Sequence, residues 1–454
     1  MGCTSSMPNK IYNVGKMKKK KKRKLNIPEV VVFVPALRLP GETNLQRALR
    51  GVLPRHLVDR LSSLRSQIVI LAEDTGGLAF NELQRALEDY LPVLIGLVNK
   101  EFSLDQTVDF KWKNLQDGRQ EICIASSWFE LLSVVNMIPI LLMSEANSLL
   151  IPKESLDVAE RTVSEDCKKD AVDLLIKASG YLDFCIRCIL VQMPPDIKAK
   201  LPTDLQEDFL GAVSFQALGQ GTEMQLGLAV ENQKATLSVK RRLACEQLKY
   251  FAQDSGSTIF ILLEIYCALE ETECFAAMVR LAHYFLSKCD MNNAQGKKQL
   301  LFLKWKYLEA KAAAYYYHGL ILDKGKEPSC HITAVCCFLA ADELLTDSKK
   351  ANLSFCVASP VTRSPPVWGV MKHLYQRIPD VASKKLQMYG YLLEQEKALQ
   401  ALPDLPDFSL SLRAEDYTLP DMDPAWNGEK WEAQVQTLKE HLNDLGDDEP
   451  ENNE

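Results

Sequence analysis

The residues whose types and spacing best suit chemistry lie at the start of the chain. The run Met1-Gly2-Cys3-Thr4-Ser5-Ser6 fits the acceptor pattern for N-myristoylation, in which removal of Met1 exposes the amine of Gly2. Cys3 stands beside that glycine, where a second, palmitoyl chain is commonly added. The chemistry that these residues predict is therefore acylation of the chain itself, at Gly2 and Cys3.

A run of basic residues follows this motif, with no acidic residue between them. Its eight cationic side chains are Lys16, Lys18, Lys19, Lys20, Lys21, Lys22, Arg23 and Lys24. One myristoyl chain gives only marginal membrane binding, and each lysine or arginine near an anionic leaflet adds about 1 kcal/mol of attraction. The combination predicts a leader that anchors the protein to a membrane. The run 18–24 by itself is also a nuclear-localisation pattern, which leaves the nucleus as the alternative location.

The body of the chain differs from this leader in charge. Nine of the 53 basic residues lie in 1–24, which leaves 44 basic against 60 acidic side chains and a net charge of −16 for the remainder. An acidic body argues against nucleic-acid binding. The 13 cysteines, without a secretory signal, predict reduced cytosolic thiols. Since no uninterrupted apolar run reaches about 18 residues, no transmembrane helix is expected.

Most of the chain shows the hydrophobic periodicity of helices. Before residue 155 we expect an extended entry segment, two helices (the first capped by Thr43 and split at Gly51 and Pro54), a hairpin turning at Asp117-Gly118 and a buried helix. These are Glu29–Leu39, Thr43–Leu64, Phe80–Phe102, Thr107–Cys123 and Ser126–Leu150. The later expected helices are Glu165–Met193, Asp204–Ala252, Thr258–Lys288, Lys297–Leu322, Ser329–Thr346 and Val367–Leu402.

Short polar connections between these helices predict antiparallel pairs stacked as a solenoid. Lys297–Leu345 resembles a tetratricopeptide-style pair, in which small residues around Ala312 let the second helix pack closely. Four prolines in Leu402–Trp426 predict an extended chain along the body. We therefore expect a disordered leader over 1–27, one helical domain over 28–426, and a C-terminal helix with an acidic tail over 427–454.

The sequence contains no recognisable catalytic constellation. It lacks a glycine-rich phosphate loop in a strand–helix context, a His-Glu-x-x-His zinc motif and a Gly-x-Ser-x-Gly elbow, and its six histidines are dispersed. Cys185 and Cys188 lie in an apolar helical pattern without a second pair at zinc spacing. We expect a protein that is not an enzyme and has no cofactor, no metal and no small-molecule substrate.

Five passages in order are similar to those of one known family. They are Phe110-Lys111-Trp112 with Phe129-Glu130 to Asn136, Asp170–Leu190, Ala217–Glu223 with Tyr250-Phe251, Lys306–Gly319, and Pro366–Pro379. From about Pro28 to Trp426 the chain resembles the Bro-one domain, the endosomal-targeting module of Alix, Brox and rhophilin. Within that family it is most similar to short, lipid-anchored, single-domain members.

The resemblance implies a mainly α fold, a curved, banana-shaped helical solenoid with a tetratricopeptide-like core and a small sheet near its N-terminal part. It also implies an adaptor that binds ESCRT-III subunits of the charged multivesicular body class, whose C-terminal amphipathic helix lies in an apolar groove. Alignment through Glu223 and Tyr250-Phe251 places the groove residues at Leu226, Val239 and Leu243. Leu226 stands where the family has an aromatic residue.

The expected function is a membrane-anchored adaptor in endosomal sorting or membrane remodelling, on the cytoplasmic face of the plasma membrane or endosomes. Its expected partners are an ESCRT-III C-terminal helix and an anionic membrane surface. One alternative is a general signalling scaffold that binds small GTPases or kinases at the plasma membrane, and failure to bind any ESCRT-III tail would favour it. Another is an unrecognised enzyme, which a convergent polar pocket would indicate.

The leader generates a direct prediction. Gly2→Ala removes the acylated amine position, so we expect the variant to move from membranes to the cytosol in cell fractionation, because the basic run alone gives weaker binding. Thr4→Ala, which changes a position that the acceptor pattern leaves free, is the control for a merely altered leader and should stay on membranes. A Gly2→Ala protein that stays fully membrane-bound contradicts the predicted myristoylation.

Overall fold

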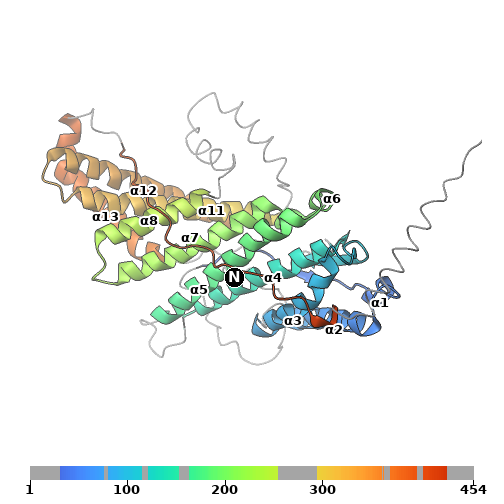
Figure 1. The fold of residues 1–454 in the computed structure, drawn as a ribbon. Helices are drawn as coiled ribbons and strands as arrows, with labels where there is room; N and C mark the ends of the chain where they lie inside the picture. The colour runs from blue at the N-terminus through green and yellow to red at the C-terminus, as the bar shows by residue number, and fades with distance from the viewer. Residues whose placement is uncertain are drawn as a thin grey trace, which may run out of the picture. The chain divides into compact units, whose positions relative to one another are not determined.

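The computed structural model describes residues 31–75, 80–114, 121–152, 163–253, 294–359, 361, 369–395 and 402–426. The predicted leader and tail, and the expected helix Thr258–Lys288, lie outside the described residues. The described chain is mainly helical with one small antiparallel sheet, which confirms the predicted fold class (Figure 1). It divides into two compact units. Of the described residues, unit 1 holds 31–36, Leu142–Asp183 and Glu207–Asp416, and unit 2 holds Leu37–Leu141, Phe184–Gln206 and those from Tyr417 onwards.

Unit 2 contains a three-stranded antiparallel sheet in the order β1-β2-β3. The strands are β1 Arg38–Pro40, β2 Asp109–Asn114 and β3 Glu121–Ala125. β2 and β3 form the predicted hairpin, with Trp112 opposite Ile122. β1 is shorter than the expected extended segment, because residues 31–37 form neither helix nor strand. Pro35 in that stretch has no N–H to give to a ladder.

Helices and short turns surround this sheet in unit 2. They are α1 Leu45–Ala48, α2 Arg55–Thr75, α3 Phe80–Val98, the first part of α4 Ser127–Leu149, a π-helical turn Cys185–Leu190, α6 Pro195–Lys198, and 3₁₀ turns Thr203–Leu205 and Pro424–Trp426. The predicted break at Gly51 and Pro54 is confirmed, because α1 ends at Ala48 and α2 begins at Arg55. The predicted cap at Thr43 is wrong: the Asn44 side chain accepts from the Arg47 N–H at 2.9 Å, because α1 begins one residue later than expected.

Two helices of the described chain are long and apolar enough to cross a membrane, by length and composition alone: α4 and α12 (Pro328–Val357). A buried core helix passes the same test. In α4, 89% of the apolar window is buried within the protein, which agrees with the predicted buried helix over Ser126–Leu150. In α12 the buried share is 44%.

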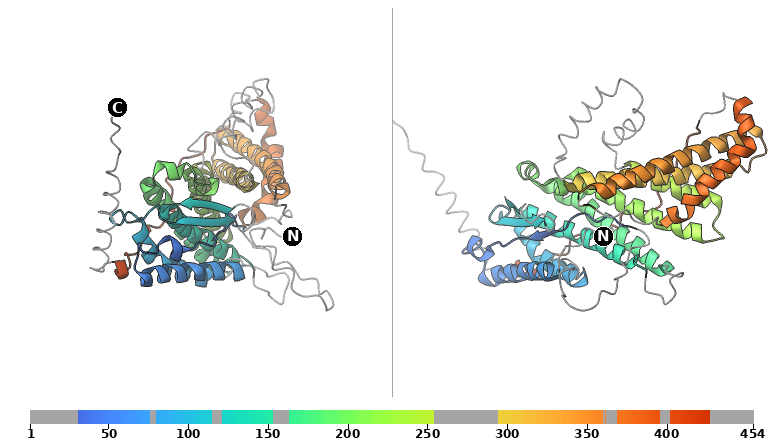
Figure 2. Two further views of the ribbon diagram at one scale, coloured as in Figure 1. Left: turned by 90° about the vertical axis from the view of Figure 1, so that its right-hand side faces the viewer. Right: turned by 180° about the vertical axis from the view of Figure 1, so that it is seen from behind.

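Unit 1 is an array of long helices. They are α5 Glu165–Phe184, α7 Glu207–Glu231, α8 Leu237–Gln253, α11 Ala294–Leu322, α12 Pro328–Val357 and α13 Gly369–Gln395, and the last part of α4 joins them. Figures 1 and 2 show α11 and α12 side by side, joined by the short polar turn that the sequence predicts. α12 ends at Val357 rather than at Thr346. α13 is described up to Gln395, and the predicted end of its helix at Leu402 follows residues outside the described ones.

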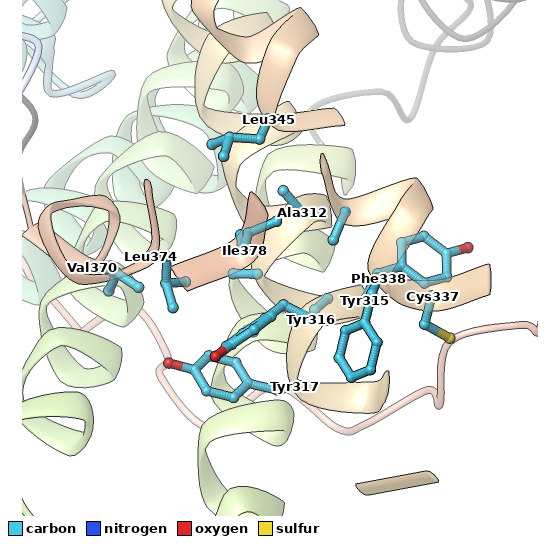
Figure 3. Close-up of a cluster of buried hydrophobic side chains, with 14 of the residues drawn as sticks. Ala312, Tyr315, Tyr316, Tyr317, Cys337, Phe338, Leu345, Val370, Leu374 and Ile378 are labelled. Carbon is cyan, nitrogen blue, oxygen red and sulfur yellow. The ribbon is translucent and has the colours of Figure 1, made fainter. Parts of the chain in front are cut away.

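Small residues bring α11 and α12 close together. Ala312 and its alanine neighbours are fully buried, and an added Cβ at Gly319 would lie 2.8 Å from the Phe338 ring. Figure 3 shows Tyr316 of α11 and Phe338 of α12 in the cluster that these helices share with α13, with ring centroids 6.2 Å apart. The expected tetratricopeptide-style pair is thus a tightly packed antiparallel hairpin.

The segment that the sequence predicts as extended crosses unit 1 as a strap of residues 402–416, without helix or strand. The Glu415 N–H donates to the Ile176 carbonyl of α5 at 3.3 Å, and the Tyr250 hydroxyl donates to the Leu412 carbonyl at 2.5 Å. An added Cβ at Gly180 would lie 2.0 Å from the Glu415 carbonyl oxygen. Gly180 is therefore required for the close approach of the strap to α5.

This close approach predicts opposite effects for two helical glycines. Gly180→Ala must displace the strap, so we expect a loss of about 1–3 kcal/mol in the free energy of unfolding, measured by urea titration. Gly227→Ala is the matched control, because its Cβ would meet only Val370, at 4.0 Å. Alanine is the better helix former there, so we expect a gain of up to about 1 kcal/mol. Equal effects of the two substitutions would contradict the assigned packing.

Candidate partner-binding surface

The segment that carries the predicted groove residues is a helix–turn–helix rather than one helix. The expected continuous helix Asp204–Ala252 is wrong, because residues 232–236 interrupt it. The Asn232 side chain accepts from the Lys234 N–H at 2.9 Å, and the Thr236 hydroxyl accepts from the Val239 N–H at 3.3 Å. Thr236 thereby caps the N-terminus of α8, and local side-chain bonds of this kind compete with helix continuation.

The turn separates the three predicted partner-binding residues. Leu226 lies in α7 and is 0% exposed, within the core cluster shared with α11, α12 and α13. Val239 and Leu243 lie on α8, four residues apart and so on one face. Val239 is 45% exposed, and Leu243 is half-buried against the same core cluster. The structure thus presents α8, with Leu226 beneath it, as the accessible part of the predicted site.

Cations surround this apolar pair. Between residues 232 and 245 the only charged side chains are Lys234, Lys240, Arg241 and Arg242. Lys234 and Arg242 are exposed, and Lys240 is half-buried. The nearest acidic residue along α8, Glu246, is buried and already engaged by Arg242 at 2.6 Å. The α8 surface therefore combines an apolar centre with a positive rim.

Arg241 is turned inward and ties α8 to its neighbours. Its Nη1 lies 3.2 Å from Nδ1 of His318 on α11, and its guanidinium lies 5.9 Å from the centre of the Phe408 ring in the strap. Burial, followed by the charge of Arg241, lowers the pKa of His318. A neutral imidazole can accept from the guanidinium, so this contact is favoured at neutral pH.

The strap fixes the far end of the same helix. The carboxylate of Glu246 accepts from the Ser411 N–H at 2.9 Å, and Lys249 binds Asp407 at 2.8 Å. These contacts and that of Tyr250 hold α8 against unit 1 along its second half. The first half, with Val239 and Leu243, is the part left accessible.

Two of the passages that carry the family resemblance meet in a buried ion cluster of unit 1. The Lys306 ammonium lies 2.8 Å from Glu223 and 3.1 Å from Glu309, and all three side chains are almost fully buried. Burial alone would lower the pKa of Lys306, but the attraction of the two carboxylates outweighs it and the pKa is raised. Burial raises the pKa of Glu309. These residues are structural, a role that the sequence analysis did not assign.

A second buried cluster joins the hairpin and α4 in unit 2. Glu130 accepts from the Trp112 indole N–H at 2.6 Å and pairs with Arg65 at 2.8 Å. Burial would lower the pKa of Arg65, yet Glu130 raises it, whereas burial and Glu130 together raise the pKa of Tyr90 well above its usual value. A charged pair of this kind is retained only where hydrogen bonds satisfy it.

Glutamines of α7 hold the chain that follows the leader. Gln220 donates to the Val31 carbonyl at 2.6 Å and Gln216 to the Phe33 carbonyl at 2.7 Å. The Phe33 ring stacks on Phe302 of α11, with centroids 5.2 Å apart. Residues 31–36 are thus a buried part of unit 1. The acylation candidates Gly2 and Cys3 and the eight basic leader residues lie outside the described residues.

The described residues offer no arrangement suited to metal chemistry. Among them, no group of three or more histidine, cysteine, aspartate or glutamate side chains is placed to hold a metal ion. Cys185 is buried in the π-helical turn, and burial raises the pKa of its thiol, which leaves it protonated at neutral pH.

Comparison with known proteins agrees with this architecture. No protein-family model and no curated protein sequence matches the chain. Among solved structures, ALIX in complex with the SIVmac239 PYKEVTEDL late domain is similar, with a TM-score of 0.56 and 15% identity over 87% of this chain and 50% of that one. A Bro1 domain described as a basis for endosomal targeting has a TM-score of 0.52 and 14% identity over 91% and 99%.

The ALIX BRO1 domain in complex with CHMP4C gives a TM-score of 0.56 and 16% identity over 86% of this chain and 97% of that one. At these identities the likeness defines the fold, so the chain has the fold of the Bro1, or Bro-one, domain. It spans about half the length of the ALIX chain in the first of these structures.

The buried cluster around Lys306 predicts a large effect from a single substitution. Lys306→Met leaves two carboxylates buried without their cation, so we expect a loss of about 3–5 kcal/mol in the free energy of unfolding, measured by urea titration. Adding Glu223→Gln and Glu309→Gln removes both charges and should restore part of that loss. Lys350→Met, at an exposed surface pair with Asp347, is the control and should change the value by less than about 0.5 kcal/mol.

Proposed function

We propose that the chain is a non-enzymatic adaptor that binds ESCRT-III subunits of the charged multivesicular body class through α8. The observation that carries the proposal is the accessible pair Val239 and Leu243 with its positive rim, in a chain with the Bro1-domain fold. One structure of that fold holds CHMP4C, which supports the choice of partner class.

The surface suits a helix better than an extended peptide. Residues four apart on α8 present two apolar contacts along one line, which is what the apolar face of an amphipathic helix can cover. The rim of Lys234, Lys240 and Arg242 favours acidic residues on the flanks of that helix. Leu226 has no exposed surface to offer, so in this proposal it supports α8 from the core rather than touching the partner.

The leader supplies the membrane part of the proposal. An acylated Gly2, with Cys3 and the eight basic residues from Lys16 to Lys24, would hold the adaptor on the cytoplasmic face of the plasma membrane or of endosomes. The proposed domain extent is one helical module over 28–426 between this leader and the tail. The support for anchoring is the order of the motifs in the sequence.

The partner surface is tested by substituting its two apolar residues separately. Val239→Asp and Leu243→Asp each place a carboxylate in the apolar centre, so we expect at least a tenfold weaker capture of an ESCRT-III C-terminal helix, on the order of 1.4 kcal/mol or more. Leu353→Asp is the matched control, since Leu353 is an exposed leucine of α12 outside this surface.

Val239→Asp keeps the test decisive if Leu243→Asp is unstable, because Val239 is the more exposed of the two. Circular dichroism checks that each variant is folded. Undiminished binding by folded Val239→Asp protein would refute the α8 site. Capture of a small GTPase in place of every ESCRT-III tail would favour the signalling-scaffold alternative.

A further inference from the structure

The strap of residues 402–416 lies on the same face of α8 as the proposed partner-binding residues. Positions 239, 243, 246 and 250 are spaced by four, three and four residues, so they form one line along the helix. Val239 and Leu243, at the start of this line, are accessible. At its end, Glu246 accepts from the Ser411 N–H at 2.9 Å, and Tyr250 donates to a strap carbonyl at 2.5 Å. The strap therefore covers the continuation of the proposed partner surface.

The uncovered part of α8 is short for a partner helix. It runs from Leu237 to Cys245, which makes it about 14 Å long, whereas a partner helix of about three turns is about 16 Å long. On the side of the α7–α8 turn, the exposed side chains are polar or cationic, namely Asn232, Gln233 and Lys234. Further apolar contacts for a partner helix lie in the other direction along α8, beneath the strap.

The strap fills this position with apolar side chains of its own. Asp407 and Ser409 are exposed, whereas Phe408 between them is half-buried. Leu405 and Phe408 pack against the same core cluster as Leu243 of α8. Inward-facing apolar residues of an extended segment thus occupy apolar surface that the face of an amphipathic helix would cover. The strap holds the place of a ligand on this part of α8.

Side chains, rather than a backbone ladder, hold this part of the strap. Lys249 pairs with Asp407 at 2.8 Å, and both side chains are partly exposed. Within the described parts of the chain, Glu415 is the one strap residue that forms a backbone–backbone hydrogen bond. An exposed ion pair contributes little to stability. Residues 402–412 can therefore leave α8 while Glu415 stays attached to α5.

We propose that residues 402–412 of the strap are an autoinhibitory element, which a partner helix displaces in order to lie along the whole face of α8. Glu246 retains its pair with Arg242 at 2.6 Å when Ser411 leaves, so opening strands no buried charge. The inference rests on the proposed function, because it assigns a competitor to the proposed partner surface. The affinity for a partner then depends on the fraction of molecules with an open strap as well as on direct contacts.

Amide hydrogen exchange distinguishes a displaced strap from a fixed one. The full-length chain is measured with and without a saturating peptide of the CHMP4C C-terminal helix. Binding should speed exchange of the Ser411 amide at least about threefold, because its acceptor Glu246 lies on the face that the peptide takes. Exchange of the Glu415 amide should stay the same. Exchange at Ser411 that slows or does not change on binding overturns the inference, since a strap that stays in place keeps its bond to α8.

Loosening the strap tests the same inference through affinity. Asp407→Asn/Phe408→Ser removes the ion pair with Lys249 and the apolar contact with the core cluster. We expect this variant to bind the CHMP4C peptide at least about fivefold more tightly in fluorescence anisotropy, because a larger fraction of molecules is open. Asp404→Asn/Ser409→Ala is the matched control, with the same change of charge at two exposed strap side chains that the contacts above do not involve. It should bind as the unmodified chain does.

The outcomes separate this inference from the proposed function. Equal affinities of the unmodified chain and Asp407→Asn/Phe408→Ser overturn autoinhibition and leave the α8 site intact, and so do equal gains in the variant and its control. Tighter binding that is lost on adding Val239→Asp supports both the site and its competitor. Failure of the peptide to bind any of these proteins, the loosened variant included, overturns the proposed function and the inference with it. If the loosened variant does not fold, hydrogen exchange of the unmodified chain decides.

Discussion

The burial of the Lys306 ammonium between Glu223 and Glu309 is the constraint on which unit 1 depends. A buried cation is tolerated only with its counter-charges in place, so α7 and α11 must meet in a single register. That register places Gln216 and Gln220 against residues 31–36, and it leaves α8 to pack over the end of α11 through Arg241 and His318. The accessible surface of α8 is thus a consequence of an interaction in the core.

Buried polar and charged contacts recur in the passages that resemble the known family. Phe110, Trp112 and Glu130 in unit 2, like Glu223 and Lys306 in unit 1, are buried residues whose hydrogen bonds and charges tolerate little change. Helical periodicity, the turn at Asp117-Gly118 and the short polar connection after α11 predicted the mainly helical fold, the hairpin and the α11–α12 pair. Solved structures of the same fold at about 15% identity agree with that reading.

Sequence periodicity failed to predict helix ends that depend on hydrogen bonds between a side chain and the nearby backbone. The break between α7 and α8 depends on Asn232 and Thr236, whose side chains bond to the backbone of their own turn within an otherwise continuous apolar pattern. The cap at Asn44 is a similar case. For the candidate site, helical spacing correctly put Val239 and Leu243 on one face. Spacing does not predict how far a side chain is buried beneath other helices. Only the tertiary structure shows that Leu226 is fully buried.

The attachment of residues 31–36 has a mechanical consequence. A pull on the chain ahead of Val31 is borne by the side-chain amides of Gln220, Gln216 and Asn147 and by the stacked rings of Phe33 and Phe302. Tension therefore enters unit 1 through α4, α7 and α11, and the buried ammonium of Lys306 joins the last two of these helices. A tether at the N-terminus would therefore load the helices that carry the buried cluster of Lys306, Glu223 and Glu309.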